Sequence, residues 1–203
     1  MKISVVGGAG HVGLPLSLQI AHRGHDVVAI DSNLQRVDMI KNGLIPFLEP
    51  GLKSLLSSVL VDGSFKIDHR YEMVDGAEVV IVVVGTDLNV MGQPQNSSVF
   101  AAIRQFEKYL SPATSLVLRS TVMPNTTELV SQSLEGRVGE VAFCPERIAE
   151  GNALRELEDI PQLVGTREGK GSEKLTELFS SLGIAIVNVT WVEAELGKLM
   201  LNA

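Results

Sequence analysis

A glycine-rich run directly behind the first apolar stretch of the chain constrains the fold more than any other feature. Residues 2–6 are typical of a strand, and Gly8, Gly10 and Gly13 follow in the spacing GxGxxG, with helix-forming residues behind them. In a strand, turn and helix unit such glycines allow a tight turn, a close approach of the backbone to a pyrophosphate, and packing of the helix on the strand. The N–H groups at the start of the helix favour a bound phosphate. The run therefore predicts a dinucleotide-binding unit.

Asp31 indicates which dinucleotide to expect. It ends the second apolar run, 18 residues after Gly13. A carboxylate there accepts hydrogen bonds from the adenosine ribose hydroxyls and repels a 2′-phosphate, which favours NAD over NADP. The alternative is a glycine turn and a strand-end Asp without a ligand. His11 has no metal-ligand spacing with the other three histidines, so we expect its ring beside the dinucleotide and no metal site.

Apolar runs of strand length alternate with helical patterns along the whole chain. This rhythm predicts an α/β fold, a doubly wound (Rossmann-like) parallel sheet with helices on both faces. The runs are mostly Val, Ile and Leu, as in strands buried on both faces. The expected strands are residues 2–6, 26–30, 78–84, 115–118, 140–143, 162–164 and 184–187. The expected helices are residues 12–23, 33–41, 51–60, 97–109, 125–134, 171–182 and a last one from Thr190, where Thr190 and Glu193 form a capping box.

The length and composition of the chain limit its number of domains, its binding partners and its cellular compartment. At 203 residues the chain fits one large domain, or one domain and part of another. The net charge of −7 argues against nonspecific binding to nucleic acid or to an anionic membrane surface. The longest apolar run, residues 79–84, is too short for a membrane span. The single cysteine, Cys144, excludes an internal disulfide and indicates a reducing, cytoplasmic compartment; we expect it to be a buried thiol.

Polar residues follow several of the expected strands. Thr86, Ser120, Thr121 and Glu146 each come shortly after an apolar run. Ligands of doubly wound sheets bind at the carboxyl ends of the strands, so we expect these side chains at one edge of the sheet. Three long segments, residues 43–51, 86–98 and 145–159, exceed ordinary connections, and such loops are usually functional or disordered.

Lys198 and Asn202 are four residues apart on the last expected helix and therefore share one face. An ammonium and an amide donor that converge on one substrate oxygen would stabilise the alkoxide character that hydride removal requires. On the residues alone, a solvated pair of Glu195 and Lys198 on the helix surface is favoured instead.

Seven motifs make the chain resemble the UDP-glucose/GDP-mannose dehydrogenase family of nucleotide-sugar dehydrogenases. They are GAGHVGLPLS at 8–17, DSNLQR at 31–36, EPGL at 49–52, VGT at 84–86, STVMPNTT at 120–127, PERIAEG at 145–151 and ELGKLMLN at 195–202. The resemblance implies the NAD-binding domain of an enzyme that oxidises the C6 alcohol of a UDP-sugar twice, to the uronate, with two NAD.

The resemblance also implies roles for individual residues. Lys198 and Asn202 become catalytic, and Thr121 and Glu146 position water near the substrate. The implied cofactor contacts are Gly8, Gly10, His11, Val12, Gly13, Asp31, Arg36, Val84, Gly85, Thr86, Ser120, Thr121 and Glu150. The implied substrate contacts are Glu146, Arg147, Ile148, Ala149, Glu150, Lys198 and Asn202.

Some residues depart from the common form of the family. Asp87 replaces the proline of TP, and Met123 and Asn125 replace the first proline and the glycine of STVPPGTT. Arg147 after the glutamate resembles the members that oxidise UDP-N-acetylhexosamines, so we favour UDP-N-acetylmannosamine over UDP-glucose as the substrate.

The family pattern divides the chain into an NAD-binding domain, residues 1–189, and the start of a linking helix, residues 190–203. It implies a homodimeric complete enzyme, whose nucleophilic cysteine would lie beyond this sequence, so we expect the chain alone to bind NAD without turnover. Two alternatives are a stand-alone NAD-sensing module, which has no need of Lys198 and Asn202, and a β-hydroxyacid dehydrogenase relative, in which PERIAEG and EPGL have no place.

Overall fold

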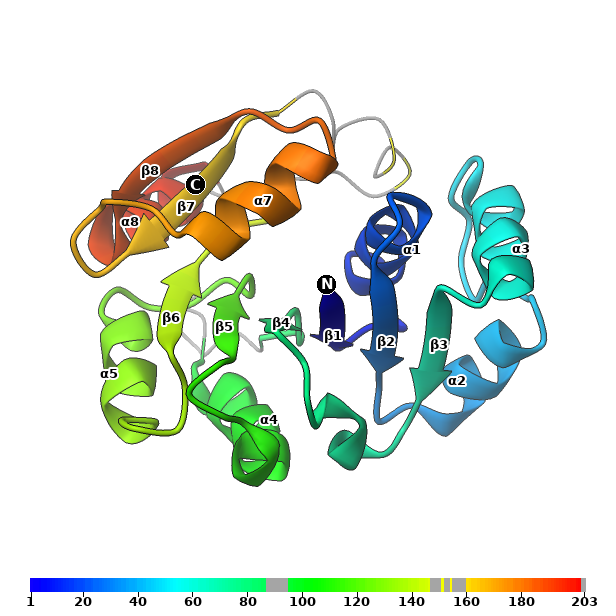
Figure 1. Ribbon diagram of the computed structural model, residues 1–203, viewed down its shortest axis with the longest axis horizontal. Coiled ribbons are helices and arrows are strands. Elements are labelled where there is room, and N and C mark those ends of the chain that lie inside the picture. The colour runs from blue at the N-terminus through cyan, green and yellow to red at the C-terminus, as the bar shows by residue number, and fades with distance from the viewer. Residues whose placement is uncertain (87–94, 147–150, 152–153, 155–159, 202–203) are drawn as a thin grey trace.

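The computed structural model describes residues 1–86, 95–146, 151, 154 and 160–201, and within them one sheet of eight strands, in the order β3-β2-β1-β4-β5-β6-β7-β8 (Figure 1). The strands are β1 Lys2–Val6, β2 Asp26–Ile30, β3 Phe65–Asp68, β4 Val79–Val82, β5 Ser115–Leu118, β6 Glu140–Phe143, β7 Gln162–Thr166 and β8 Ile186–Thr190. The helices are α1 Gly13–His22, α2 Leu34–Lys41, α3 Leu52–Asp62, α4 Ser97–Phe106, α5 Thr126–Ser133, α7 Glu173–Ser181 and α8 Trp191–Leu201, with short 3₁₀ helices at Tyr71–Val74 and Glu107–Tyr109.

Six strands, β1 to β6, form the expected parallel sheet; Val5, for example, pairs with Ala29 on one side and Ile81 on the other. The expectation of a wholly parallel sheet is wrong at β7, which pairs antiparallel with β6 through Phe143 and Gly165. Because β7 runs antiparallel to β6, it starts at the carboxyl edge, where β6 ends, and runs back toward the amino edge. Helix α7 provides the crossover connection between β7 and β8, which are parallel.

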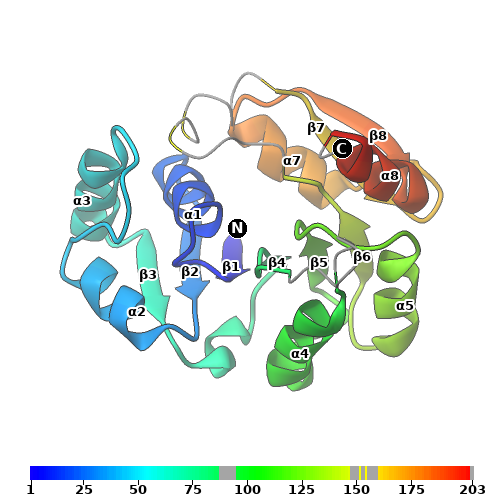
Figure 2. The same cartoon turned by 180° about the vertical axis from the view of Figure 1, so that it is seen from behind.

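Helices cover both faces of the sheet, as expected. In Figures 1 and 2, α1 and α7 lie on one side of the strands and α4 and α5 on the other. Successive strand residues alternate between the two resulting cores, so that Val5 faces α1 and α3 whereas Val6 faces α4 and α5. The last helix, α8, approaches β7 closely at Gly165, where a Cβ atom would lie 2.7 Å from the Cβ of Ala194.

The element bounds agree with the sequence expectation at β1, β2, β5 and β6. Strand β4 is shorter than residues 78–84, β7 is longer than 162–164, and β8 begins two residues after 184. Strand β3 was not expected. The capping box of α8 is confirmed, because the N–H of Thr190 donates to Glu193 at 2.7 Å and the N–H of Glu193 donates to the Thr190 hydroxyl at 3.4 Å.

Candidate functional site at the carboxyl edge

The glycine turn after β1 is packed so tightly that two of its glycines are sterically required. A Cβ at Gly8 would lie 2.6 Å from the Cβ of Ala29 in β2, and one at Gly13 would lie 2.2 Å from the carbonyl oxygen of Gly7. The positive φ of the turn, +89°, belongs to Gly7 and not to Gly8, the first glycine of the motif. The turn thus holds the start of α1 directly against the ends of β1 and β2.

Gly10 differs from its neighbours because the protein leaves space beside it. A Cβ there would meet only the carbonyl oxygen of Gly7, at 3.5 Å, which is ordinary contact. Among the residues that the structure describes, the N–H groups of His11, Val12 and Gly13 have no hydrogen-bond partner. Open backbone and unpaired N–H groups at a helix start form a cradle that fits the diphosphate of a dinucleotide.

Asp31 joins the end of β2 to the glycine turn. Its carboxylate accepts the N–H of Ala9 at 2.9 Å and the N–H of Asn33 at 2.9 Å. Asn33 in turn caps α2 by accepting the N–H of Arg36 at 3.1 Å. The half-buried carboxylate is therefore held in place and retains acceptor capacity for ribose hydroxyls, which fits the expected adenosine end of NAD.

The ring of His11 stacks on Phe47, with ring centroids 4.1 Å apart and an interplanar angle of 27°. Phe47 belongs to the long segment 43–51 and was not among the expected site residues. Its only sequence signal was the unusual length of that segment, with prolines at 46 and 50.

The segments that follow β4 and β5 meet at the carboxyl edge of the sheet. The hydroxyl of Ser120 donates to the carbonyl oxygen of Val84 at 2.7 Å. Thr86 and Thr121 are half-buried in the same two segments, next to the glycine turn after β1. The structure therefore brings these expected cofactor residues to one edge.

Glu146, after β6, is held by a buried cation that the sequence analysis did not identify. Arg119, directly after β5, donates from Nη2 to Glu146 at 2.6 Å and from Nη1 to Gln162 at 2.7 Å. The side chains of Arg119 and Glu146 are only 2% and 8% exposed. Lys198 of α8 donates to the backbone carbonyl of Glu146, so the two expected site residues meet.

Glu195 does not form the solvated surface pair with Lys198 that the residues alone favoured. It is fully buried and accepts hydrogen bonds at the start of α5, from the N–H of Asn125 at 2.6 Å and from the N–H and hydroxyl of Thr127. Asn125 has φ +71°, a conformation natural to the glycine usual there in the family form, and Asn is among the residues that tolerate it. The motifs STVMPNTT and ELGKLMLN are therefore in direct contact.

Cys144 is the buried thiol that the sequence predicted. It is fully buried, and burial raises the pKa of the thiol to about 12. A thiol with such a pKa is neutral at physiological pH and is a poor nucleophile.

Several expected residues lie outside the described part of the chain. They are Asp87, Arg147, Ile148, Ala149, Glu150 and Asn202.

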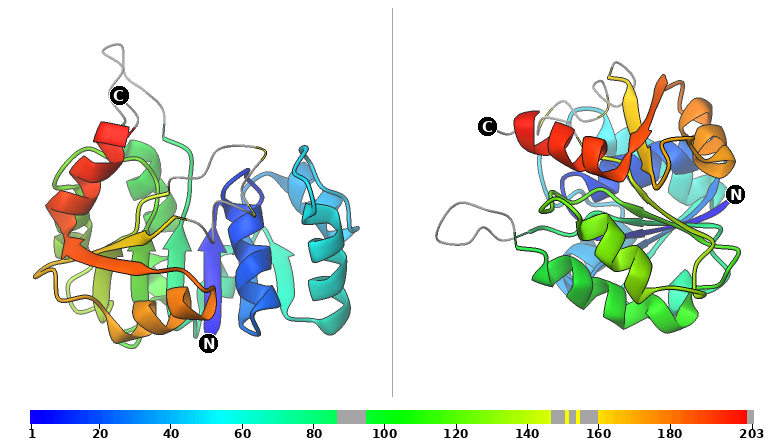
Figure 3. Two further views of the ribbon diagram at one scale, coloured as in Figure 1. Left: turned by 90° about the horizontal axis from the view of Figure 1, so that it is seen from above. Right: turned by 90° about the vertical axis from the view of Figure 1, so that its left-hand side faces the viewer.

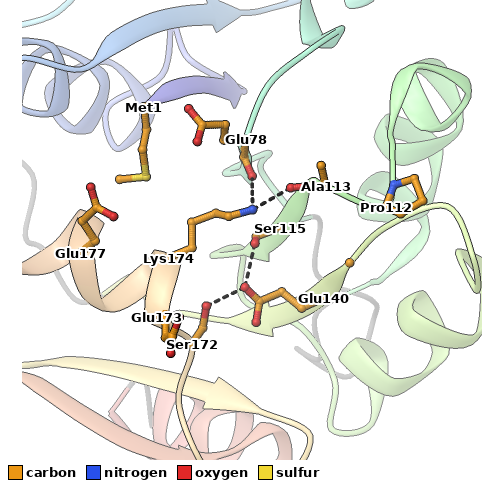
Figure 4. A pocket seen from close by; sticks show the side chains of 11 residues that line it. Met1, Glu78, Pro112, Ala113, Ser115, Glu140, Ser172, Glu173, Lys174 and Glu177 are labelled. Atoms are coloured by element: carbon orange, nitrogen blue, oxygen red, sulfur yellow. Dashed lines mark hydrogen bonds between the residues drawn. The ribbon is translucent and has the colours of Figure 1, made fainter.

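A hollow of about 650 Å³ lies at the opposite, amino edge of the sheet (Figure 4). Four carboxylates line it, from Glu78, Glu140, Glu173 and Glu177. Lys174 donates to the carbonyl oxygen of Ala113 at 2.6 Å, and Glu140 accepts the hydroxyls of Ser115 and Ser172. These bonds join α7 to the sheet, and the four carboxylates would repel a diphosphate, so this hollow does not suit a dinucleotide.

Within the described residues, no helix is long and apolar enough to cross a membrane, and no three metal-binding side chains cluster.

Comparison with known proteins shows which family the chain resembles. Residues 1–183 match the model of the UDP-glucose/GDP-mannose dehydrogenase family, NAD binding domain. The UDP-N-acetyl-D-mannosamine dehydrogenase of Methanococcus maripaludis is 30% identical over 204 residues, 99% of this chain and 47% of the relative. The UDP-glucose 6-dehydrogenase of Bacillus subtilis is 30% identical over 210 residues, 100% of this chain and 48% of the relative.

Solved structures agree with this match. The structure of the UDP-D-ManNAc dehydrogenase from Pyrococcus horikoshii superposes with a TM-score of 0.91 at 30% identity, covering 100% of this chain and 50% of that one. The chain thus spans about half the length of the curated relatives it matches.

Proposed function

Because this chain belongs to the UDP-glucose/GDP-mannose dehydrogenase family and is its NAD-binding domain, we propose that it works in an enzyme that oxidises the C6 alcohol of a UDP-sugar to the uronate, with two NAD. The observation that carries the proposal is the cradle at Gly10, open where a diphosphate would lie and lined by unpaired N–H groups. Asp31, fixed by the N–H of Ala9, holds the adenosine ribose and selects NAD over NADP.

NAD, when bound, accepts the hydride that leaves the sugar carbon. The chain's own residues bind NAD and the sugar and orient them for the transfer. The N–H groups at the start of α1 hold the diphosphate. Arg36, whose backbone N–H donates to Asn33 at the start of α2, is proposed to contact the adenosine end. Val84, Gly85, Thr86, Ser120 and Thr121 supply the cofactor-facing edge after β4 and β5. Glu150 is proposed to contact both nicotinamide and sugar.

Lys198 is proposed to act at the reacting oxygen. Its ammonium is anchored beside the backbone of Glu146, where positive charge stabilises developing alkoxide character on the C6 oxygen. Asn202, four residues further along the sequence, is proposed to donate to the same oxygen.

Glu146 and Thr121 are proposed to position the water that the uronate-forming step consumes. The Arg119 ion pair fixes the carboxylate of Glu146, which supports this role because an oriented acceptor can hold a water in one place. The following residues, Arg147, Ile148, Ala149 and Glu150, are the proposed sugar contacts. The arginine can donate to an acetamido carbonyl, and relatives carry the name UDP-N-acetyl-D-mannosamine dehydrogenase, so we favour that substrate over UDP-glucose.

The second oxidation of the family requires a cysteine that attacks the aldehyde. Cys144 cannot serve, because it is fully buried and its pKa is raised to about 12. We therefore propose that residues 1–189 form the NAD-binding domain, that residues 190–203 begin the linking helix, and that the chain alone binds NAD without forming uronate.

The complete enzyme is proposed to be a homodimer that joins through the helix begun by α8. Support comes from the apolar side chains that α8 exposes at four-residue intervals, Val192, Leu196 and Met200, which are 41%, 44% and 79% exposed.

Calorimetric titration of the 203-residue chain with NAD and NADP tests the binding claim, with NAD expected to bind far more tightly. Following NADH absorbance after adding UDP-N-acetylmannosamine or UDP-glucose tests whether the chain alone turns over. No sustained rise in absorbance is expected. Tighter binding of NADP would contradict the cofactor assignment. Sustained NADH production would contradict the expectation that the chain alone binds NAD without turnover.

A further inference from the structure

The long segment 43–51, here called the bridging loop, touches both parts of the proposed site. Phe47 stacks on His11 of the glycine turn, with ring centroids 4.1 Å apart. Two residues later, Oε2 of Glu49 accepts the N–H of Gly151, the last residue of the motif PERIAEG, at 3.0 Å. The bridging loop therefore contacts the dinucleotide cradle through an aromatic ring and the proposed sugar-contacting motif through a carboxylate.

Leu154, three residues after Gly151, lies beside α1 and the end of the bridging loop. A Cβ at Gly51, which ends the bridging loop, would lie 3.3 Å from Cδ1 of Leu154, and Gln19 of α1 reaches the carbonyl oxygen of Leu154 at 3.5 Å. Leu154 also packs on the core beneath α1 and α3, as does Phe47. In the left view of Figure 3 these two helices, α1 in blue and α3 in cyan, lie side by side. Gly151 and Leu154 are thus anchored on the bridging loop and α1.

The geometry points to Phe47 and Glu49 as positioning residues that couple occupancy of the dinucleotide cradle to the place of Gly151. This inference rests on the proposed function, because it takes the glycine turn as the NAD site and PERIAEG as the sugar contact. A dinucleotide that fixes the His11 ring also fixes Phe47, which stacks on it, and Glu49 then holds the Gly151 N–H in place. By linkage, a fixed Gly151 in turn favours the bound dinucleotide.

The chain offers a matched control inside the bridging loop. Leu48 lies between the two positioning residues, yet its side chain is 95% exposed, whereas Phe47 and Glu49 are half-buried. A substitution at Leu48 changes the same loop without touching either contact.

The test is hydrogen exchange of the Gly151 amide, followed by NMR in the 203-residue chain with and without saturating NAD. In the wild type we expect NAD to slow this exchange by about 10-fold, a factor within the usual range of coupling between sites. Glu49→Ala should bind NAD but lose the slowing. Glu49→Gln should keep it in large part, because the amide oxygen can accept the same hydrogen bond.

Phe47→Leu retains an apolar side chain on the core but removes the ring stack, so it should reduce the NAD-dependent slowing while the fold persists. Leu48→Ala should behave as the wild type. The inference is overturned if the wild type binds NAD with no change at Gly151, or if Glu49→Ala shows the full slowing. Failure of the proposed function looks different, because calorimetry would then detect no NAD binding to the wild type at all.

Discussion

The carboxylate of Glu195 accepts both the N–H and the hydroxyl of Thr127, at 2.8 and 2.6 Å. Its second oxygen accepts the N–H of Asn125 at 2.6 Å, so one buried side chain of α8 satisfies the start of α5. Negative charge at a helix start is also favourable to the helix dipole. Lys198 follows one turn later on α8. Glu195 therefore fixes the rotation and depth of the helix that carries the proposed catalytic lysine.

Glu195→Ala should destabilise the fold strongly. The substitution leaves two backbone N–H groups and one hydroxyl without their acceptor, and the two Thr127 groups among them are buried, so the loss should be about 3 kcal/mol in the free energy of unfolding. Glu195→Gln keeps one acceptor oxygen and should lose less. Urea unfolding measures both.

Glu128→Ala is the matched control, since it removes an exposed carboxylate from the first turn of the same helix α5. It should change the unfolding free energy only slightly. Equal losses of unfolding free energy in Glu195→Ala and Glu128→Ala would show that the buried Glu195 carboxylate does not hold α8 in place.

Gly10→Ala should separate cofactor binding from stability. The backbone of Gly10 does not have a positive φ, and a Cβ meets nothing closer than 3.5 Å. The variant should therefore be as stable as the wild type or gain about 0.4–1 kcal/mol from the stiffer unfolded chain. The same methyl group occupies the diphosphate cradle, so NAD affinity should fall by about 10-fold or more, which is at least about 1.4 kcal/mol. Calorimetry and thermal unfolding are the measurements.

Gly13→Ala provides the contrast. Its methyl group would lie 2.2 Å from the carbonyl oxygen of Gly7, so the turn must move and stability should fall by about 2–3 kcal/mol. If Gly10→Ala were the less stable of the two variants, the assignment of the open position to the ligand would be wrong.

Local signals explain which parts of the fold were predictable. The capping box at Thr190 depends on residues three apart, and the buried parallel strands are continuous apolar runs, so sequence reveals both. Strand β3 was missed because it has four residues in which buried Phe65 and Ile67 alternate with Lys66 and Asp68, too short a pattern to distinguish from a loop. The direction of β7 depends on the path of the preceding connection, and no property of its own residues records that path.

Asp31→Asn should reduce the preference for NAD over NADP. The amide keeps the size of the side chain but removes its charge, so the repulsion of a 2′-phosphate disappears and the charged hydrogen bonds to ribose weaken. We expect NAD affinity to fall by about 10-fold or more and NADP affinity to rise. Titration with both dinucleotides gives the ratio. Asp38→Asn, an exposed change on the neighbouring helix α2, should leave the ratio unaltered; an equal shift there would indicate a general charge effect.

The residues of the candidate site were likewise predictable only where the signal lay close to them in the sequence. The glycine motif and Asp31 could be assigned to the expected NAD site because spacing after a strand is a local signal. Arg119 and Glu195 were missed or misassigned because their partners lie far away in sequence, Glu146 and Gln162 for one and Thr127 for the other. A charged residue directly continuing a buried strand, as Arg119 continues β5, was the available signal for a buried ion pair.

Cys144 should resist modification for as long as the fold persists. Burial raises the pKa of its thiol to about 12, so the reactive thiolate is almost absent at neutral pH and increases only as the pH approaches that value. Labelling with a thiol reagent at pH 8 should be very slow in buffer and fast in concentrated urea, where the pKa returns to its ordinary value of about 8.5. Rapid labelling of the folded chain would show that the thiol is accessible and would reopen a chemical role for it.

The buried pair of Arg119 and Glu146 should show strong coupling in a double-mutant cycle. Arg119→Met leaves the carboxylate without its cation and Gln162 without a donor, whereas Glu146→Leu leaves a guanidinium buried without a counter-charge. Each single change should cost about 3–5 kcal/mol in unfolding free energy. The double variant removes both charges and should lose clearly less than the sum of the two single losses.

Urea unfolding of the four proteins measures this coupling, and additive losses would mean that the pair contributes nothing as a pair. The result also determines how activity measurements at Glu146 are to be interpreted. A variant such as Glu146→Ala combines loss of an oriented acceptor with loss of a buried counter-charge, so its activity alone cannot assign the residue to water positioning. Glu146→Gln can still accept from Arg119 but also removes the buried counter-charge, so it should cost less unfolding free energy than Glu146→Leu, and its activity is informative once that loss has been measured.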